Sequence, residues 1–394
     1  MWWVFQIGAR EHYAVPRALE LAGRLGGVVT DFWVPPGSWW SRWGSQRMRD
    51  RFHGELGGAR VESFNWRMGV FEGMLRMRRV RGMAAPMARN ERFQELAVER
   101  LRRLPGGAEV TVFSYSYAAR EIFRYARTRG WRTVLGQIDP GPEEERIVGE
   151  EHDREGARLG ARWTPAPGRY WELWREEVAL ADRVLVNSEW SRECLKREGI
   201  AGEKMVVVPL VFSGGGAGAT LVDGDGERLS ADGGEERRPF RVLFLGQINL
   251  RKGVARLLEA MRLLRGEAIE LVLAGPTGID PLSWADLPSV RWVGPVPRSG
   301  VAEYYRGADL FILPTLSDGY ALTQLEAMAH GLPVLASRCC GEAVVPGENG
   351  FIIEDLTAEG IAKAIREARE RLPLAGVRGP DFTLGDLGRE LLSL

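Results

Sequence analysis

The sequence predicts an α/β protein built from two Rossmann-like domains, and three observations lead to this expectation. The chain has 394 residues, which is enough for two domains of ordinary size. Short, continuously apolar runs alternate with amphipathic stretches, as in parallel strands that are buried on both faces between helices. This alternation stops at one segment rich in Gly and acidic residues, and it then begins again.

The first series of elements fills residues 1–212. The expected strands lie at 2–7, 28–34, 110–113, 133–135, 184–186 and 205–208, and a helix is expected at 12–25. Each strand run is short and apolar at successive positions, which is typical of a parallel strand covered on both sides. Residues 1–212 are therefore expected to form an amino-terminal domain.

The break lies at 213–239, SGGGAGATLVDGDGERLSADGGEERRP, which has neither a helical nor a strand period. We interpret this segment as a Gly-rich, acidic linker. A second domain is expected at 240–375, followed by a terminal segment at 376–394. Its expected strands lie at 241–246, 269–275, 290–294, 309–314, 333–337 and 351–354, with helices at 253–264 and 321–330.

Composition argues against several classes of protein. Lys plus Arg and Asp plus Glu each total 53, and this balance gives no reason to expect a nucleic-acid partner. Three cysteines are too few for a disulfide framework in a chain of this length. The start, MWWVFQIGAR, lacks the features of a signal peptide, and no apolar run approaches the roughly 18 residues that span a bilayer. We therefore expect a cytoplasmic protein.

One stretch, 39–103, departs from the overall charge balance. It holds Trp39, Trp40 and Trp43 together with several methionines, and residues 67–103 contain ten Arg against four Glu, a local net charge of +6. One interpretation is a solvated, Arg-rich helical face. The other is a face that docks on an anionic acceptor or peripherally on the inner face of an anionic membrane.

Two loops carry chemically apt residues, and the first is GQINLRKG at 246–253. No GxGxxG follows a strand and no GxxxxGK[ST] occurs, which disfavours a dehydrogenase or a P-loop enzyme. Arg251 and Lys252 stand beyond a strand at a helix start, where backbone N–H groups and the helix dipole favour an anion such as a diphosphate. A solvated Lys-Gly pair at a helix start is the simpler alternative.

The second loop begins PTLSDGYALTQLEAMAHGLPVLAS at 314–337. Asp318 is expected just after a strand, and Glu326 about two turns inside the following helix. Gly319 lies between them and permits close backbone approach. Two carboxylates at this spacing are common by chance, so the spacing alone assigns no function.

Residues 240–370 contain five segments in the order RKG, LVLAGP, VRWVGPVP, DGYALTQLEAMAHGLPV and PGENGFII. By the order of these segments, residues 240–370 resemble the retaining glycosyltransferases of family four, also called glycosyl transferases group 1. Residues 181–210 resemble that family more weakly, and 35–105 match no part of it. The resemblance implies a GT-B fold, in which two Rossmann-like domains face each other across a cleft. It also implies that 1–212 is the acceptor-side domain, that 240–375 binds the donor, and that 376–394 crosses back to the amino-terminal domain.

The reaction implied by this resemblance is transfer of a sugar from a nucleoside-diphosphate sugar to an acceptor, with retention of configuration and without a metal or other cofactor. The acceptor is expected to be lipid-linked or a glycan. Two alternatives stay open. Asp318 in place of Glu and Gln247 in place of Arg suggest a non-catalytic homologue that binds a nucleotide sugar, and a GT-B epimerase or phosphorylase is the second alternative.

The roles of the donor-binding residues come from the same resemblance. Lys252 is expected to bind the diphosphate and Glu326 the ribose hydroxyls. Asp318 occupies the position of a Glu that contacts the donor sugar, with a side chain that is one carbon shorter. Gln247 stands where an Arg commonly binds phosphate, and Arg251 is expected to supply that charge instead.

The remaining donor contacts are backbone and lining positions. The amides expected to face the sugar and phosphates are those of Gly319, Tyr320, Ala321 and Leu322, while Val296 lines the base and Gly8, with Ala9, belongs to a loop over the diphosphate.

In the amino-terminal domain, the segment GQIDPGPEEE at 136–145 carries the candidates for a group near the transferred sugar. These are Gln137 and Asp139, and a turn or capping role is the alternative for Asp139. We expect no metal, because the four His show no ligand spacing and the DGD at 223–225 lies in the linker.

Overall fold

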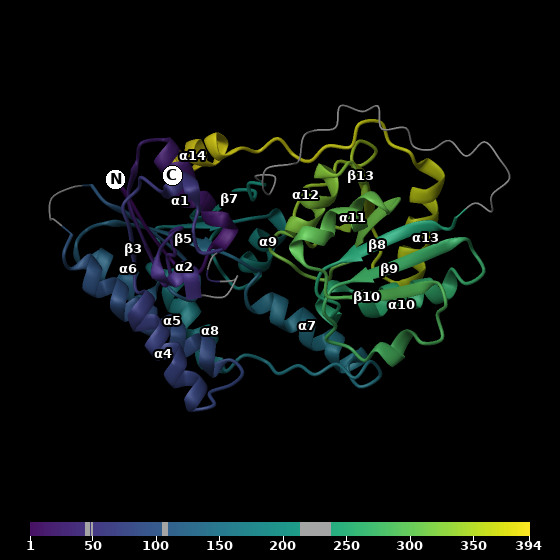
Figure 1. The fold of residues 1–394 in the computed structure, drawn as a ribbon, viewed down its shortest axis with the longest axis horizontal. Coiled ribbons are helices and arrows are strands. Elements are labelled where there is room, and N and C mark those ends of the chain that lie inside the picture. The colour runs from purple at the N-terminus through teal and green to yellow at the C-terminus, as the bar shows by residue number, and fades with distance from the viewer. Residues whose placement is uncertain (44–47, 49, 105–108, 213–237) are drawn as a thin grey trace. The chain divides into compact units, whose positions relative to one another are not determined.

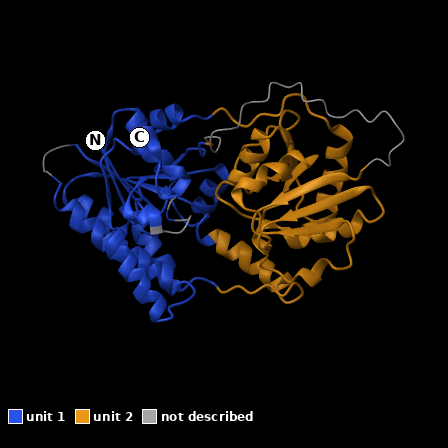
Figure 2. Cartoon of the chain, in the orientation of Figure 1, with its two compact units in different colours: residues 1–142, 165–211, 382–394 blue, residues 143–164, 212–381 orange. Residues whose placement is uncertain are grey.

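The computed structural model describes residues 1–43, 48, 50–104, 109–212 and 238–394 (Figure 1). These residues form two compact units (Figure 2). Unit 1 comprises 1–142, 165–211 and 382–394, and unit 2 comprises 143–164 and 212–381. Almost all of the expected linker, 213–237, lies outside the described residues.

Unit 1 is built on a seven-stranded parallel sheet with the order β3-β2-β1-β4-β5-β6-β7. The strands are β1 (Trp2–Gln6), β2 (Leu25–Thr30), β3 (Val61–Ser63), β4 (Thr111–Tyr115), β5 (Arg132–Gln137), β6 (Arg183–Val186) and β7 (Met205–Val207). Six of them coincide with expected runs. The strand β3 was not predicted, because three residues with one apolar side chain give no pattern to detect.

Helices cover both faces of this sheet (Figure 1). Unit 1 contains α1 (Ala14–Leu21), α2 (Trp39–Trp43), α4 (Asn65–Met77), α5 (Ala84–Leu101), α6 (Arg120–Thr128), α8 (Gly168–Leu180), α9 (Glu189–Arg197) and α14 (Leu384–Ser393). The expected helix at 12–25 is wrong at both ends. It begins only at Ala14 because Glu11, His12 and Tyr13 all have positive φ, and it ends four residues before β2 begins at Leu25.

Successive residues of β1 enter the cores on opposite sides of the sheet. Trp3 and Phe5 pack with residues of α5, α6 and α8, whereas Trp2 and Val4 pack with residues of α1 and α14. All four side chains are buried. This arrangement confirms that the continuous apolar run is a strand covered on both faces.

Unit 2 is built on a six-stranded parallel sheet with the order β10-β9-β8-β11-β12-β13. The strands are β8 (Phe240–Leu245), β9 (Ile269–Ala274), β10 (Val290–Gly294), β11 (Leu310–Leu313), β12 (Val334–Ser337) and β13 (Gly350–Ile353). Its helices are α10 (Val254–Leu263), α11 (Val301–Arg306), α12 (Leu322–Ala329) and α13 (Ala358–Arg371). All six strands and the helices α10 and α12 lie where the sequence predicts them.

One segment groups with a different unit from the expected one. Residues 143–164, with most of α7 (Pro142–Glu155), group with unit 2 although they were assigned to the domain at 1–212. Arg256 of α10 holds them there through a bidentate ion pair with the buried Glu151. Residues 382–394 group with unit 1, where Leu387 and Leu391 of α14 pack with α1.

Candidate active site

The loop after β8 delivers two cations to the carboxyl edge of the unit 2 sheet. Asn249 accepts a hydrogen bond from the Lys252 N–H at 3.1 Å and so caps a short 3-10 turn, Leu250–Lys252. Gly253 then adopts φ +71°, and a Cβ at this position would lie 1.9 Å from the Pro314 carbonyl oxygen. Only glycine therefore allows Lys252 to approach the end of β11 this closely.

Lys252 and Arg251 converge on Asp318. The Lys252 Nζ donates to Asp318 Oδ2, and Arg251 Nη1 lies 3.5 Å from Asp318 Oδ1. Arg251 Nη1 also donates to the Ser317 carbonyl at 3.1 Å and lies 3.6 Å from Glu144 Oε2. The structure thus brings together the three charged residues that the sequence places after two different strands.

The charge state of Asp318 follows from these neighbours. Burial opposes ionisation of the carboxyl group, but the positive charges of Lys252 and Arg251 outweigh it and hold the pKa of Asp318 below its ordinary value. Asp318 is therefore ionised at neutral pH. Its carboxylate can accept hydrogen bonds from hydroxyl groups, while the two cations beside it can attract an anion.

Glu326 is positioned by a residue that the sequence did not reveal. Tyr305 of α11 donates its hydroxyl to Glu326 Oε2 at 3.0 Å and stacks on the His330 ring at 5.2 Å. Burial and the Glu326 charge both raise the pKa of Tyr305, so the hydroxyl stays a donor. No local signal pointed to this pair, because 20 residues separate the two positions in the sequence.

The amides after Asp318 differ in what they already bind. The Ala321 N–H donates to the Cys340 carbonyl at 3.0 Å, and Gln324 Nε2 donates to the same oxygen at 2.9 Å. The Ala321 N–H thus anchors the start of α12 instead of facing a ligand. For Gly319, Tyr320 and Leu322, a backbone amide that faces the sugar or the phosphates stays a prediction.

Gln247 and Val296 lie in loops at the same edge of the sheet. Gln247 is exposed directly after β8, and its Oε1 accepts from Asn249 Nδ2 at 3.4 Å. Val296 is half-buried in the loop after β10. Their expected phosphate and base contacts stay predictions.

Gly8, in the loop after β1, is bound to a buried carboxylate. Its N–H donates to Asp31 Oδ1 at 2.8 Å, and the Asp31 side chain is fully buried. Asp31 also pairs with Arg51 at 3.0 Å and with Arg89 of α5 at 2.5 Å. A single Asp in the middle of the apolar run 28–34 is the sequence signal for this cluster, and it was not identified from the sequence.

Asp139 lies at the carboxyl edge of the unit 1 sheet, on the wall of a cavity of about 240 Å³. Its Oδ1 accepts from the Tyr117 hydroxyl at 2.6 Å, from Gln137 Nε2 at 3.0 Å and from the Gly141 N–H at 2.9 Å. Burial and the Asp139 charge raise the pKa of Tyr117 well above its ordinary value. Asp139 thus both organises a turn and faces the cavity.

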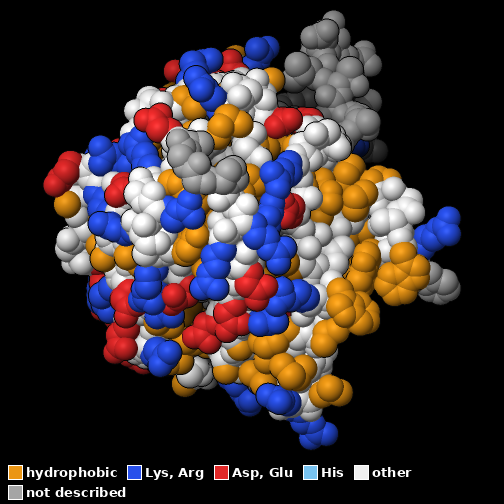
Figure 3. Space-filling model, turned by 90° about the vertical axis from the view of Figure 1, so that its left-hand side faces the viewer, with side chains coloured by type: hydrophobic (Ala, Val, Ile, Leu, Met, Phe, Trp, Pro, Cys, Tyr) orange, Lys and Arg blue, Asp and Glu red, His pale blue; other side chains and the backbone are white. Residues whose placement is uncertain are grey.

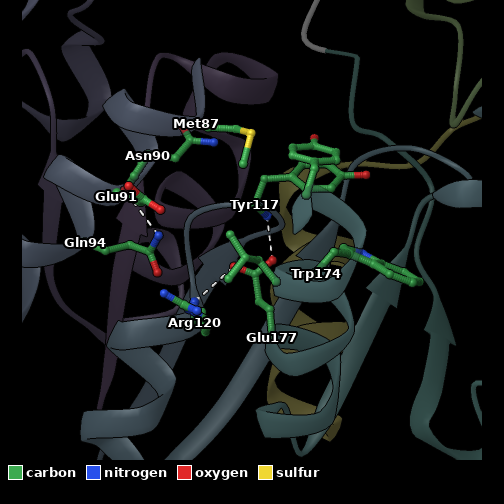
Figure 4. Close-up of a pocket in the computed structure, with 10 residues that line it drawn as sticks. Met87, Asn90, Glu91, Gln94, Tyr117, Arg120, Trp174 and Glu177 are labelled. Atoms are coloured by element: carbon green, nitrogen blue, oxygen red, sulfur yellow. Dashed lines mark hydrogen bonds between the residues drawn. The ribbon is translucent and has the colours of Figure 1, made fainter. Parts of the chain in front are cut away.

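A second pocket lies on the other side of Tyr117 and is lined by α5 and α8 (Figure 4). Here the buried Glu177 accepts hydrogen bonds from the backbone N–H groups of Tyr117 at 2.5 Å, Ala119 and Arg120 at 3.0 Å. Burial raises the pKa of Glu177 to about 7, against the lowering effect of these N–H groups. Glu177 of α8 therefore caps α6 and fixes the turn that carries Tyr117.

Within the described ranges, no group of three or more His, Cys, Asp or Glu is placed to hold a metal ion. The DGD at 223–225 lies outside those ranges. The three cysteines form no disulfide. No helix among the described residues is both long enough and apolar enough to cross a bilayer.

Known proteins resemble the chain in two ways. Residues 239–370 match the family described as glycosyl transferases group 1. Among curated proteins, D-inositol 3-phosphate glycosyltransferases of Thermobifida fusca and Kineococcus radiotolerans are 30% and 31% identical, over 51% and 49% of this chain and 51% and 50% of their own lengths. The chain thus spans about half the length of the curated relatives that it matches.

Solved structures resemble the fold over the whole chain. The sucrose-phosphate synthase of Thermosynechococcus elongatus has a TM-score of 0.58 at 19% identity, and the match covers 100% of this chain and 94% of that one. HepE of Anabaena, in complex with UDP-glucose, has a TM-score of 0.58 at 15% identity and covers 99% of each chain. The protein thus has the GT-B fold of two Rossmann-like domains, and its residues 239–370 are similar to the glycosyl transferases of group 1.

Proposed function

We propose that this chain transfers a sugar from a nucleoside-diphosphate sugar to an acceptor, with retention of anomeric configuration and without a metal ion. The observation that carries the proposal is the convergence of Lys252, Arg251 and Asp318 beyond β8 and β11. Two cations at the carboxyl edge of the sheet can bind the dianionic leaving group of a sugar diphosphate, and the ionised acid beside them can bind the sugar hydroxyls.

Unit 2 is the proposed donor-binding unit. As the glycosidic bond breaks, the leaving nucleoside diphosphate gains negative charge, and Lys252 and Arg251 stabilise that charge in place of a metal. The Asp318 carboxylate accepts hydrogen bonds from hydroxyls of the sugar. The Glu326 carboxylate, which Tyr305 orients, accepts hydrogen bonds from the ribose hydroxyls. The complex of HepE with UDP-glucose supports this class of donor.

Unit 1 is the proposed acceptor-binding unit, through the cavity of about 240 Å³ that Asp139 lines. Tyr115, Tyr117 and Arg10 also line it, so it offers hydrogen-bonding groups and a cation to a polar acceptor group. An acceptor sugar or cyclitol, carried by a lipid or a glycan, suits these groups. In this proposal the acceptor hydroxyl attacks on the face that the phosphate leaves.

A panel of UDP and GDP sugars, incubated with candidate sugar and cyclitol acceptors in the presence and absence of a chelator, tests this function. Release of nucleoside diphosphate that requires acceptor and survives the chelator is expected, and NMR of the product should show the anomeric configuration of the donor.

Three other outcomes would contradict parts of the proposal. Binding of a nucleotide sugar without any release would indicate a non-catalytic homologue. A changed sugar without transfer would indicate an epimerase. Loss of turnover in the presence of the chelator would contradict the metal-independent mechanism.

A further inference from the structure

Helix α4 of unit 1 carries an apolar stripe that faces solvent. Trp66, Val70 and Met77 are separated by four and seven residues, a spacing that puts all three on one face of the helix. They are 69%, 54% and 80% exposed. Helices of globular proteins normally bury such a stripe, and here the opposite side of α4 already supplies the core with the fully buried Met68.

Two tryptophans extend this stripe at the side of α4. A Cβ on Gly69 would lie 3.9 Å from the Trp40 ring, so Trp40 packs against the helix. Trp39 meets Trp40 edge to face, with ring centroids 5.0 Å apart, and stays 62% exposed. The exposed apolar surface thus joins two segments that lie far apart in the sequence.

The structure also divides the arginines of 67–103 into two groups. Several are neutralised by acids. The pairs are Arg67 with Glu99, Arg89 with Asp31 and Glu72, Arg92 with Glu95, and Arg100 with Glu62. By contrast five arginines are exposed and have no ion pair with any described residue, namely Arg78, Arg79, Arg81, Arg102 and Arg103.

Three of the unpaired arginines adjoin the apolar stripe. Arg78, Arg79 and Arg81 lie in the turn 78–83, which follows Met77 directly and leads into α5. The α4–α5 hairpin ends in this turn (Figure 1), and the lower end of the space-filling view shows hydrophobic side chains with Lys and Arg side chains beside them (Figure 3). Three of the five unpaired arginines of 67–103 thus border the exposed stripe, while Arg102 and Arg103 lie beyond the other end of α5.

We propose that this face, Trp39, Trp66, Val70 and Met77 with Arg78, Arg79 and Arg81, docks on the surface of an anionic lipid bilayer. Aromatic and aliphatic side chains enter the boundary between headgroups and acyl chains, and guanidinium groups bind lipid phosphates. A solvated face would account for the cations but not for the exposed apolar stripe. A hydrophobic protein interface would account for the stripe but not for the cations. The adjacency of both fits an anionic membrane surface.

Co-sedimentation of the full chain with vesicles tests the proposal. Vesicles of phosphatidylglycerol and phosphatidylcholine at 1:3 should bind the protein at about 50 mM salt, whereas pure phosphatidylcholine should bind it far less. Binding should fall sharply at about 0.5 M salt, where the Debye length is only a few Å.

Two triple variants separate the two parts of the face. Replacing Arg78, Arg79 and Arg81 by Gln should lower partition into the anionic vesicles by about 100-fold at low salt, since each basic residue near the surface supplies roughly a fivefold factor. Replacing Trp66, Val70 and Met77 by Ser should lower partition at both salt concentrations. All six side chains are exposed, so circular dichroism should show an unchanged fold.

The chain offers matched controls. Arg24, Arg162 and Arg169 are exposed and make no ion pair with described residues, so their replacement by Gln removes the same charge elsewhere. Leu282 is 76% exposed in unit 2, and Leu282→Ser removes an exposed apolar side chain. Both controls should bind like the unaltered protein. Equal losses in the control triple, or no binding to the anionic vesicles at low salt, would overturn the proposal.

Discussion

The Lys252 ammonium pairs with the Asp318 carboxylate, which lies 66 positions later in the sequence. The two loops meet because β8 and β11 are neighbours in the unit 2 sheet, and because Gly253 lets the backbone touch Pro314. The pair joins a group suited to phosphate to a group suited to sugar hydroxyls. It also holds both side chains in place before any substrate binds.

Lys252→Ala should reduce turnover about 100- to 1000-fold while the fold is kept, because the leaving diphosphate loses a fixed cation. Turnover of a nucleotide sugar and the thermal unfolding midpoint are the measurements. Lys363→Ala is the matched control, since Lys363 is an exposed lysine of α13 whose nearest acid, Glu367, lies 3.7 Å away. Near-normal turnover in Lys252→Ala would refute the phosphate role.

Glu326→Ala and Asp318→Asn should affect different steps. Loss of Glu326 should weaken binding of the free nucleoside diphosphate, because the ribose hydroxyls lose a charged acceptor. Asp318→Asn should leave that affinity undiminished and lower transfer, because Lys252 keeps its charge. Isothermal titration together with turnover measures both effects.

Tyr305→Phe serves as the control for Glu326, because it removes only the hydroxyl that orients the carboxylate. Its loss of nucleoside diphosphate affinity should be smaller than that of Glu326→Ala. Equal losses of affinity in Asp318→Asn and Glu326→Ala would contradict the division of roles.

Gly253→Ala should destabilise unit 2 and lower turnover. The added Cβ would lie 1.9 Å from the Pro314 carbonyl oxygen at φ +71°, so the Lys252 loop must move away from β11. Gly266→Ala is a matched control, because Gly266 has φ +89° but no atom within 4 Å of the added Cβ. Denaturant unfolding should show the larger loss for Gly253→Ala, and the same loss in both variants would mean that the contact is unimportant.

Glu177 should make stability depend on pH. Its pKa is raised to about 7 from 4.5 chiefly by burial, so the folded protein holds this proton more tightly than the unfolded chain does. The stabilisation is complete below about pH 4.5 and is lost as the pH rises toward 7. The unfolding free energy of the protein relative to Glu177→Gln should therefore fall by on the order of 3 kcal/mol over this range.

Glu176→Gln, at the exposed neighbouring position of α8, should keep the pH dependence of the unaltered protein. A difference between the protein and Glu177→Gln that is flat or rises between these pH values would show that burial does not dominate the ionisation of Glu177.

The sequence by itself determined the class of fold and the strand ends that carry the candidate site residues. Six of the seven strands of unit 1 and all six of unit 2 fall within or beside continuous apolar runs, because a parallel strand covered on both faces leaves this pattern locally. The loops that hold Lys252 and Asp318 follow two of these runs. Short or half-exposed elements such as β3 leave too weak a pattern to detect.

Only the tertiary structure decided which side chains meet. The order of strands in a sheet does not follow the order in the chain, so neither Lys252 with Asp318 nor Tyr305 with Glu326 could be paired from spacing. The same holds for the arginines of 67–103. The sequence shows how many arginines there are. Whether each one is neutralised depends on acids that packing brings close, and Arg89 pairs with Asp31, which lies 58 positions away in the sequence. Charge pairing acts over a few Å in space, and the sequence records separation only along the chain.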